Sequence, residues 1–173
     1  DQESDSFLKY YSKDQKRPKE KKIRAFQIRR KKKDGNHLHV HESVVSVKEV
    51  LKRSRELGVS MTVFLTAVFL KAIHEEMSKM QEKKPIVLMV PVNLRKFFPS
   101  TSMLNFFNWI EPGYDFSKRD RSFEEVLRYT KDFFEEQLTK EKMSAHINDL
   151  LALELHPILR LAPLELKNLC IHA

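Results

Sequence analysis

Three histidines at alternating positions are the first residues whose spacing suggests chemistry. His37, His39 and His41 would share one face of a β-strand, because residues two apart on a strand point the same way. Neutral imidazole is a common transition-metal ligand. The strand predicted to pair with them places Arg29 and Lys31 opposite, and no carboxylate joins them on that face. We therefore expect no metal site here and interpret the face as a solvated polar surface or a weak anion patch.

A second candidate site lies in the segment 85–110, PIVLMVPVNLRKFFPSTSMLNFFNWI, which contains the most strand-like run and the densest aromatic cluster of the chain. Residues 86–92 are continuously apolar, and this predicts a strand covered on both faces. A polar turn and a Pro-Ser-Thr-Ser loop separate it from a second predicted strand over residues 105–110. Two buried strands with polar residues at their ends indicate a binding site.

Four residues of this segment are predicted to bind substrate, and none is predicted to be catalytic: Arg95, Asn105, Asn108 and Trp109. A fixed charge-assisted hydrogen bond from Arg95 would shape the site; the alternative, and simpler, interpretation is an arginine that only covers its own loop. The two asparagines flank a pair of phenylalanines and are interpreted as lining a ligand channel; the alternative is that they satisfy backbone groups.

Positive charge is concentrated in one segment. Residues 16–33 hold eleven Lys or Arg and one acid, a net +10, so the rest of the chain carries −2 of the total +8. Specific nucleic-acid readers usually add exposed aromatics or a recognition helix, and the nearby Phe26 is predicted to face the core. We expect no specific nucleic-acid recognition, and leave nonspecific attraction to polyanions and simple solubility as interpretations of the segment.

Composition indicates a soluble globular protein of 173 residues, with 41% hydrophobic and 32% charged residues. No apolar run reaches the length of a membrane span and the first residues do not resemble a signal peptide, so we expect no membrane association and a cytoplasmic location. The single cysteine, Cys170, is interpreted as an inert buried thiol. We predict a linker with a short helix over residues 1–22 and one folded region over 23–173, with a further segment preceding the chain.

Local signals predict the elements that would position the site. A hairpin over 23–45 should turn through Lys33-Asp34-Gly35, with Gly35 at positive φ. Helices are predicted over 47–57, between a Ser46/Glu49 capping box and Gly58, and over about 61–80, where the first turns are apolar all round and should be buried. A long amphipathic helix should follow a second capping box at 122–125, with further helices after residue 142. The order indicates an α/β (α+β) fold, a mixed sheet layered with helices.

A family resemblance rests on three ordered motifs: GVSMTVFLTAVFLKAI at 58–73, VPVNLR at 90–95 and MLNFFNW at 103–109. Together they resemble the second half of a chloramphenicol-acetyltransferase-like acyltransferase, a superfamily that includes condensation domains and alcohol acetyltransferases. Phe106, Phe107 and Asn108 correspond to a Phe-Val-Asn-like strand of condensation domains, while Leu104 stands where a glycine is usual. The resemblance covers residues 38–134 and implies one subdomain of a CoA-dependent acyltransferase-like fold.

The resemblance implies transfer of an acyl group from acetyl-CoA or another acyl thioester to a small alcohol or amine acceptor, with no bound cofactor. In the family, a histidine followed four residues later by Asp-Gly acts as the general base. Here the single Asp-Gly pair, Asp34-Gly35, is preceded at that distance by Arg30. We therefore expect a partial C-terminal subdomain, inactive without an N-terminal subdomain that supplies the base. The alternative is a noncatalytic binding module whose basic arm holds nucleic acid or another anionic partner.

Overall fold

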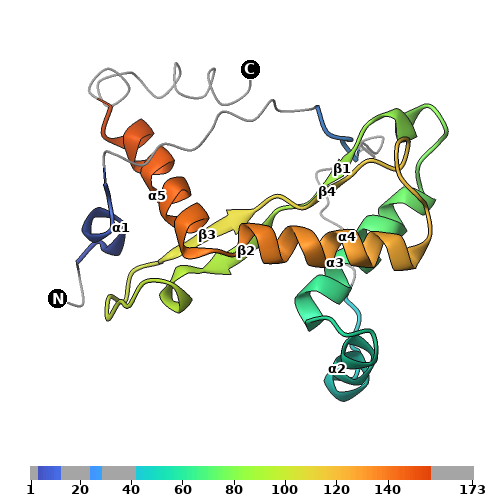
Figure 1. The fold of residues 1–173 in the computed structure, drawn as a ribbon, viewed down its shortest axis with the longest axis horizontal. Coiled ribbons are helices and arrows are strands. Elements are labelled where there is room, and N and C mark those ends of the chain that lie inside the picture. The colour runs from blue at the N-terminus through green and yellow to red at the C-terminus, as the bar shows by residue number, and fades with distance from the viewer. Residues whose placement is uncertain (1–3, 13–23, 29–41, 157–173) are drawn as a thin grey trace, which may run out of the picture. The chain divides into compact units, whose positions relative to one another are not determined.

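Helices and two small antiparallel sheets make up the computed structural model, which describes residues 4–12, 24–28 and 42–156 (Figure 1). This mixture confirms the predicted α/β class. The contacts divide the chain into two compact units. The described residues of the first unit are 4–12, 90–110 and 136–156, and those of the second are 24–28, 42–89 and 111–135. Each unit is described separately below.

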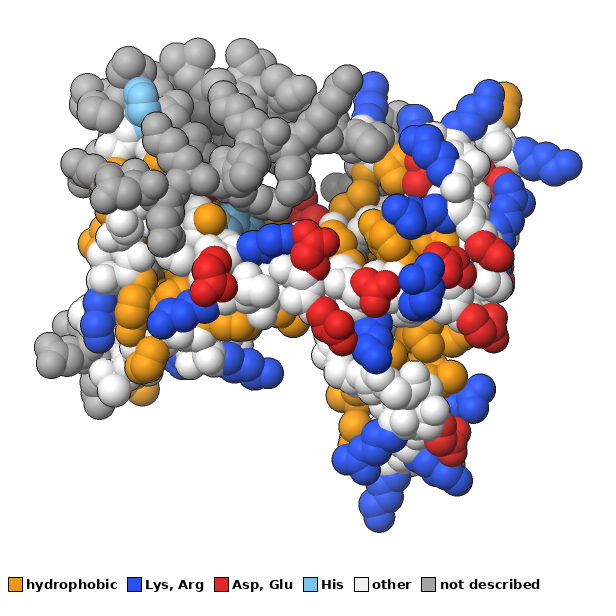
Figure 2. All heavy atoms as spheres, in the orientation of Figure 1, with side chains coloured by type: hydrophobic (Ala, Val, Ile, Leu, Met, Phe, Trp, Pro, Cys, Tyr) orange, Lys and Arg blue, Asp and Glu red, His pale blue; other side chains and the backbone are white. Residues whose placement is uncertain are grey.

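Two capped helices open the second unit: α2 (Val47–Glu56) and α3 (Met61–Glu75). The Ser46 hydroxyl accepts a hydrogen bond from the Glu49 N–H at 3.4 Å, and the Ser60 hydroxyl accepts one from the Val63 N–H at 3.2 Å. Such N-caps satisfy backbone donors that the first turn leaves unpaired. The helix predicted over 47–57 is therefore confirmed. Many basic side chains lie on the surface of α2 (Figure 2).

Gly58 ends α2 in the left-handed region, with φ of +67°. A Cβ added there would meet no atom within 4 Å, so the main expected cost of substitution is backbone strain. We expect Gly58→Val to lower the free energy of unfolding by about 1–2 kcal/mol, measured by urea denaturation. Gly58→Asn is the control and should cost clearly less, because asparagine tolerates this region. Equal losses in the two variants would contradict the strain argument.

Helix α3 buries only one of its faces. Val63, Ala67 and Leu70 are at most 5% exposed, while Phe69 is 60% exposed and Met61, Leu65 and Val68 are 37–38% exposed. The prediction that its first turns are buried all round was therefore wrong, since the described residues of this unit cover one side only. The helix also ends at Glu75, five residues earlier than predicted, and a 3-10 turn, η1 (Gln81–Lys83), follows.

The continuous apolar run 86–92 does not form one strand. Its first part is β1 (Ile86–Val87), which pairs antiparallel with β4 (Gly113–Tyr114) in the second unit. Its last part belongs to β2 (Val90–Asn93), which pairs antiparallel with β3 (Phe107–Ile110) in the first unit. Val87 is 38% exposed and Met89 68% exposed, so the prediction of a strand covered on both faces was also wrong. Each pair is a two-stranded ribbon, and burial alternates along it.

The first unit contains the β2–β3 ribbon and two helices, α1 (Ser6–Lys9) and α5 (Lys140–Glu154). The two helices contact each other, and α5 also contacts β3. The register places Val92 opposite Asn108 and Asn93 opposite Phe107. Helix α5 has three buried apolar residues at helical spacing: Met143, Ile147 and Leu151. Helix α1 lies where a short helix was predicted.

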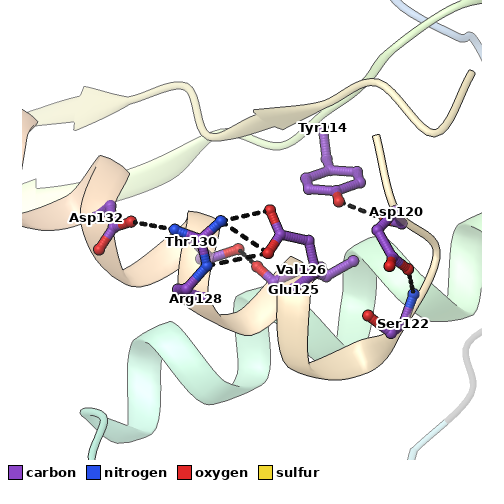
Figure 3. A network of polar contacts seen from close by, with 8 residues as sticks. All are labelled: Tyr114, Asp120, Ser122, Glu125, Val126, Arg128, Thr130 and Asp132. Carbon is purple, nitrogen blue, oxygen red and sulfur yellow. Dashed lines mark hydrogen bonds and ion pairs between the residues drawn. The ribbon is translucent and has the colours of Figure 1, made fainter. Parts of the chain in front are cut away.

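Helix α4 (Phe123–Gln137), of which residues 123–135 belong to the second unit, begins after a loop that is held by polar contacts (Figure 3). The buried Tyr114 hydroxyl donates to the Asp120 carbonyl, and the Asp120 carboxylate accepts from the Ser122 N–H at 2.7 Å. The Glu125 carboxylate accepts from the Arg128 guanidinium at 2.8 Å. The predicted helix is present, but Asp120 takes the backbone donor that Glu125 would accept in a capping box.

Several predictions fall wholly or partly outside the described residues. These include the Lys33-Asp34-Gly35 turn, the three alternating histidines and Cys170. The two ends of the predicted hairpin that are described, 24–28 and 42–45, form neither strand nor helix. Instead, the Phe26 N–H donates to the Pro85 carbonyl at 2.9 Å, just before β1. No single helix of the described ranges is long and apolar enough to cross a membrane; α2 and α3 pass that test only as a pair bent by 89°.

Candidate functional site

The candidate site is built on the connection between β2 and β3. A 3-10 turn, η2 (Leu94–Lys96), follows β2 directly, because the Asn93 side chain accepts from the Arg95 N–H at 3.0 Å and caps the turn. The fully buried Leu94 donates its N–H to the Phe106 carbonyl at 3.2 Å and anchors the turn to the start of the next strand. Local capping and one buried leucine therefore fix where Arg95 stands.

Arg95 holds the loop between the strands. Its Nη2 donates to the Ser102 carbonyl at 2.7 Å and to the Leu104 carbonyl at 2.8 Å. Hydrogen bonds from a charged donor are stronger than neutral ones, so this exposed guanidinium fixes the loop conformation. The geometry agrees with an arginine that covers its own loop, and in doing so it shapes the surface around Asn105. Its contacts make it a positioning residue.

Helix α1 supports the same loop, and sequence reasoning had not linked it to the site. The Tyr10 hydroxyl donates to the Pro99 carbonyl, and the Ser6 and Ser100 hydroxyls lie 2.5 Å apart. The Tyr10 ring also packs on Phe98, with centroids 5.0 Å apart. The apolar pair formed by residues 7 and 10, one helical turn apart, was the sequence signal that this short helix packs against a core.

Asn108 is the most unusual of the predicted binding residues. Its side chain is fully buried, its Oδ1 accepts from the Trp109 N–H at 2.8 Å, and its Nδ2 has no hydrogen-bond partner among the described residues. A buried unpaired donor costs about 1–3 kcal/mol. Buried polar groups in folded proteins are nearly always paired, so an exception calls for an explanation such as a bound ligand group.

Trp109 and Asn105 lie in different surroundings. Trp109 follows Asn108 on β3, so the two side chains point to opposite faces of the ribbon. The indole ring meets the His146 ring of α5 edge to face, with centroids 4.9 Å apart. Asn105 is exposed in the loop, beside the exposed side chains of Leu104 and Phe107. The structure thus brings Arg95 and Asn105 to one end of the ribbon and separates Asn108 from Trp109 by the strand itself.

No metal centre is formed by the residues that the structure describes, since nowhere among them do three His, Cys, Asp or Glu side chains gather with suitable geometry. His146 was not singled out from the sequence, because a histidine in an amphipathic helix gives no signal of its contact with a tryptophan on a distant strand.

Comparison with models of known protein families matches residues 5–143 of the chain to the alcohol acetyltransferase family. The matched range includes the whole β2–β3 connection and the supporting helix α1. Comparisons with curated proteins and with solved structures gave no match.

Proposed function

The chain belongs to the alcohol acetyltransferase family, and from this premise we propose that it forms part of an enzyme that transfers an acyl group from CoA or a carrier-bound thioester to an alcohol or amine. The family match over residues 5–143 is the observation that carries the proposal. It contains all four residues predicted to bind substrate, together with the turn and the helix that position them.

The chemistry requires a base. The acceptor oxygen or nitrogen attacks the thioester carbonyl, its bond to the acyl carbon forms, the carbon–sulfur bond breaks, and the acceptor proton passes through the base to the leaving thiolate. The sequence contains no His-x-x-x-Asp-Gly motif. We therefore assign the base to an N-terminal subdomain outside this chain, and assign to this chain the shaping of the donor channel.

Each predicted residue then has a limited role. Arg95 keeps the 99–106 loop in one conformation through its two carbonyl contacts. The exposed Asn105 amide offers hydrogen bonds to an amide-rich thioester arm, and Leu104 and Phe107 add apolar surface beside it. The unpaired Nδ2 of Asn108 supports a contact that substrate or a neighbouring subdomain completes.

Thiol release from acetyl-CoA tests the proposal. We expect the chain alone to release no thiol above background with a panel of primary alcohols and amines, because it lacks the base. A longer protein that carries the upstream His-x-x-x-Asp-Gly segment should release one thiol per ester or amide formed. Its His→Ala variant is the matched control and should fall to background.

If the isolated chain released thiol as fast as the longer protein, the assignment of the base to an N-terminal subdomain would be contradicted. If the longer protein consumes no thioester while the chain binds a polyanion tightly at physiological salt, the alternative of a binding module is favoured. That alternative rests on the net +10 of residues 16–33, and its binding should weaken steeply with added salt.

A further inference from the structure

A buried histidine at the end of α3 stands outside the candidate site. His74 is 7% exposed, and its ring stacks on Phe116 with centroids 3.9 Å apart and planes 11° from parallel. Its Nε2 lies 3.2 Å from Glu82 Oε1, and Glu82 Oε2 lies 2.9 Å from the Arg121 guanidinium. The ring is thus in contact with two segments, η1 and the stretch after β4.

Local structure explains why these groups meet. Helix α3 stops one residue after His74, and the Met77 N–H donates to the His74 carbonyl at 3.0 Å as the chain turns. The Gln81 side chain accepts from the Ser78 N–H at 2.8 Å, which fixes the turn that presents Glu82. Phe116, 2% exposed, comes two residues after β4 and supplies the stacking surface.

The hydrogen-bonding pattern suits a neutral ring. Neither ring nitrogen of His74 makes a well-aligned hydrogen bond within the described part of the chain, although Nε2 is within ion-pair distance of Glu82. A protonated imidazole carries two N–H donors. Glu82 is placed to accept one of them, whereas the Nδ1–H would be buried without an acceptor. Protonation therefore creates an unsatisfied donor in the interior of this unit.

Charged groups on the neighbouring segments also influence the pKa of His74. Burial is the main cause that lowers the pKa of His74 below 6.5; Glu82 opposes it, and Lys71 and Arg121 reinforce it. The Lys71 ammonium donates to the Arg121 carbonyl at 3.0 Å and lies 4.0 Å from Glu75. Beside Phe116, Asp115 is occupied by Lys118 at 2.9 Å.

We propose that His74 is a pH-sensitive latch, which holds the end of α3 against η1 and the Phe116 segment near neutral pH and releases them when the ring is protonated in mild acid. Burial, the cations Lys71 and Arg121, and a buried nitrogen without an acceptor favour the neutral ring and outweigh Glu82 and the Phe116 face, which favour the charged ring. The same contacts are lost together if the ring must move toward water to be solvated.

The direction of the pH effect follows from proton binding. Because the pKa of His74 is lower in the folded chain than its ordinary 6.5, the unfolded chain binds the proton first as the pH falls. The stability that neutral His74 contributes is fully present above pH 6.5 and is lost as the pH falls through the lowered value. Asp115 does not interfere in this range: burial opposes its charge, but hydrogen bonds from Ser117 and Lys118 bring its pKa below 3.8.

Thermal unfolding of the full chain at pH 7.5 and pH 5 tests the latch. We expect the Tm of the wild type to fall on acidification by of the order of 2–4 °C more than that of His74→Phe, which keeps an aromatic stack and cannot be protonated. His156→Gln removes an exposed histidine and should behave like the wild type. Glu82→Gln removes the acid that favours the charged ring, so its acid sensitivity should increase.

Hydrogen exchange locates the effect and does not depend on any variant folding. After correction for the intrinsic pH dependence of exchange, amides in 71–84 and 114–122 of the wild type should exchange faster at pH 5, while those in 90–110 should not. The proposal is overturned if exchange in the first two segments is unchanged, or if His74→Phe keeps the full pH dependence of the wild type.

Discussion

Replacing Phe106 by alanine is expected to lower the free energy of unfolding by about 3–5 kcal/mol, the usual cost of removing a large buried aromatic side chain. Phe106 is 2% exposed, and the Phe7 ring of α1 meets it edge to face with centroids 5.0 Å apart. The Tyr10 ring stacks beside it at 6.0 Å. The substitution leaves a cavity where α1 meets the first residue before β3.

Phe107 provides the matched control, because it is the next residue and is 50% exposed. Phe107→Ala should cost less than about 1 kcal/mol. Urea denaturation monitored by Trp109 fluorescence measures both variants, since the tryptophan lies on the same strand. Similar losses in the two variants would show that the alternation of burial along residues 106–110 is wrong.

The largest functional effect is expected for Asn108→Leu. In the longer protein proposed above, turnover should fall at least about tenfold, because the substitution removes the amide to which we assign a contact with substrate or the neighbouring subdomain. The stability of the chain should change little, since leucine removes a buried donor that has no partner among the described residues but also removes the Oδ1 that accepts from the Trp109 N–H. A residue that costs stability and supports activity is expected at a functional site.

A second buried polar residue serves as the control for this variant. Thr130 is 1% exposed, and its hydroxyl donates to the Val126 carbonyl at 2.7 Å within α4. Thr130→Val should change turnover by less than about twofold, because the helix retains its backbone hydrogen bonds. Full activity of Asn108→Leu would remove Asn108 from the substrate-binding residues, and a large loss of stability would show that its role is structural.

The helices show where sequence reasoning succeeds. The caps at Ser46 and Ser60 and the left-handed Gly58 act within three or four residues, so α2 and the start of α3 could be predicted from their neighbours in the chain. The end of α3 was placed five residues too late. No proline marks that end, and the residues that contact His74 there come from η1 and the segment after β4.

The apolar run 86–92 shows where prediction from the sequence fails. Continuous apolar residues are typical of a strand covered on both sides, yet the run is shared by β1 and β2, which pair with different strands. A run of apolar residues shows that a segment is apolar, but it does not show which strand the segment will pair with. Register and burial here depend on Gly113 and Ile110, which lie twenty or more residues after their partners Val87 and Val90.

Five features could be established from the amino-acid order without a structure: the mixed fold class, the capped helices, the motifs that resemble acyltransferases, the absence of a His-x-x-x-Asp-Gly motif and the concentration of positive charge in one segment. Tertiary structure alone decided that Arg95 binds the carbonyls of its own loop, that Asn108 is buried with an unpaired amide, and that His74 stacks on Phe116. The reason is physical: caps and turns are local, whereas burial and ring contacts join residues that only packing brings together.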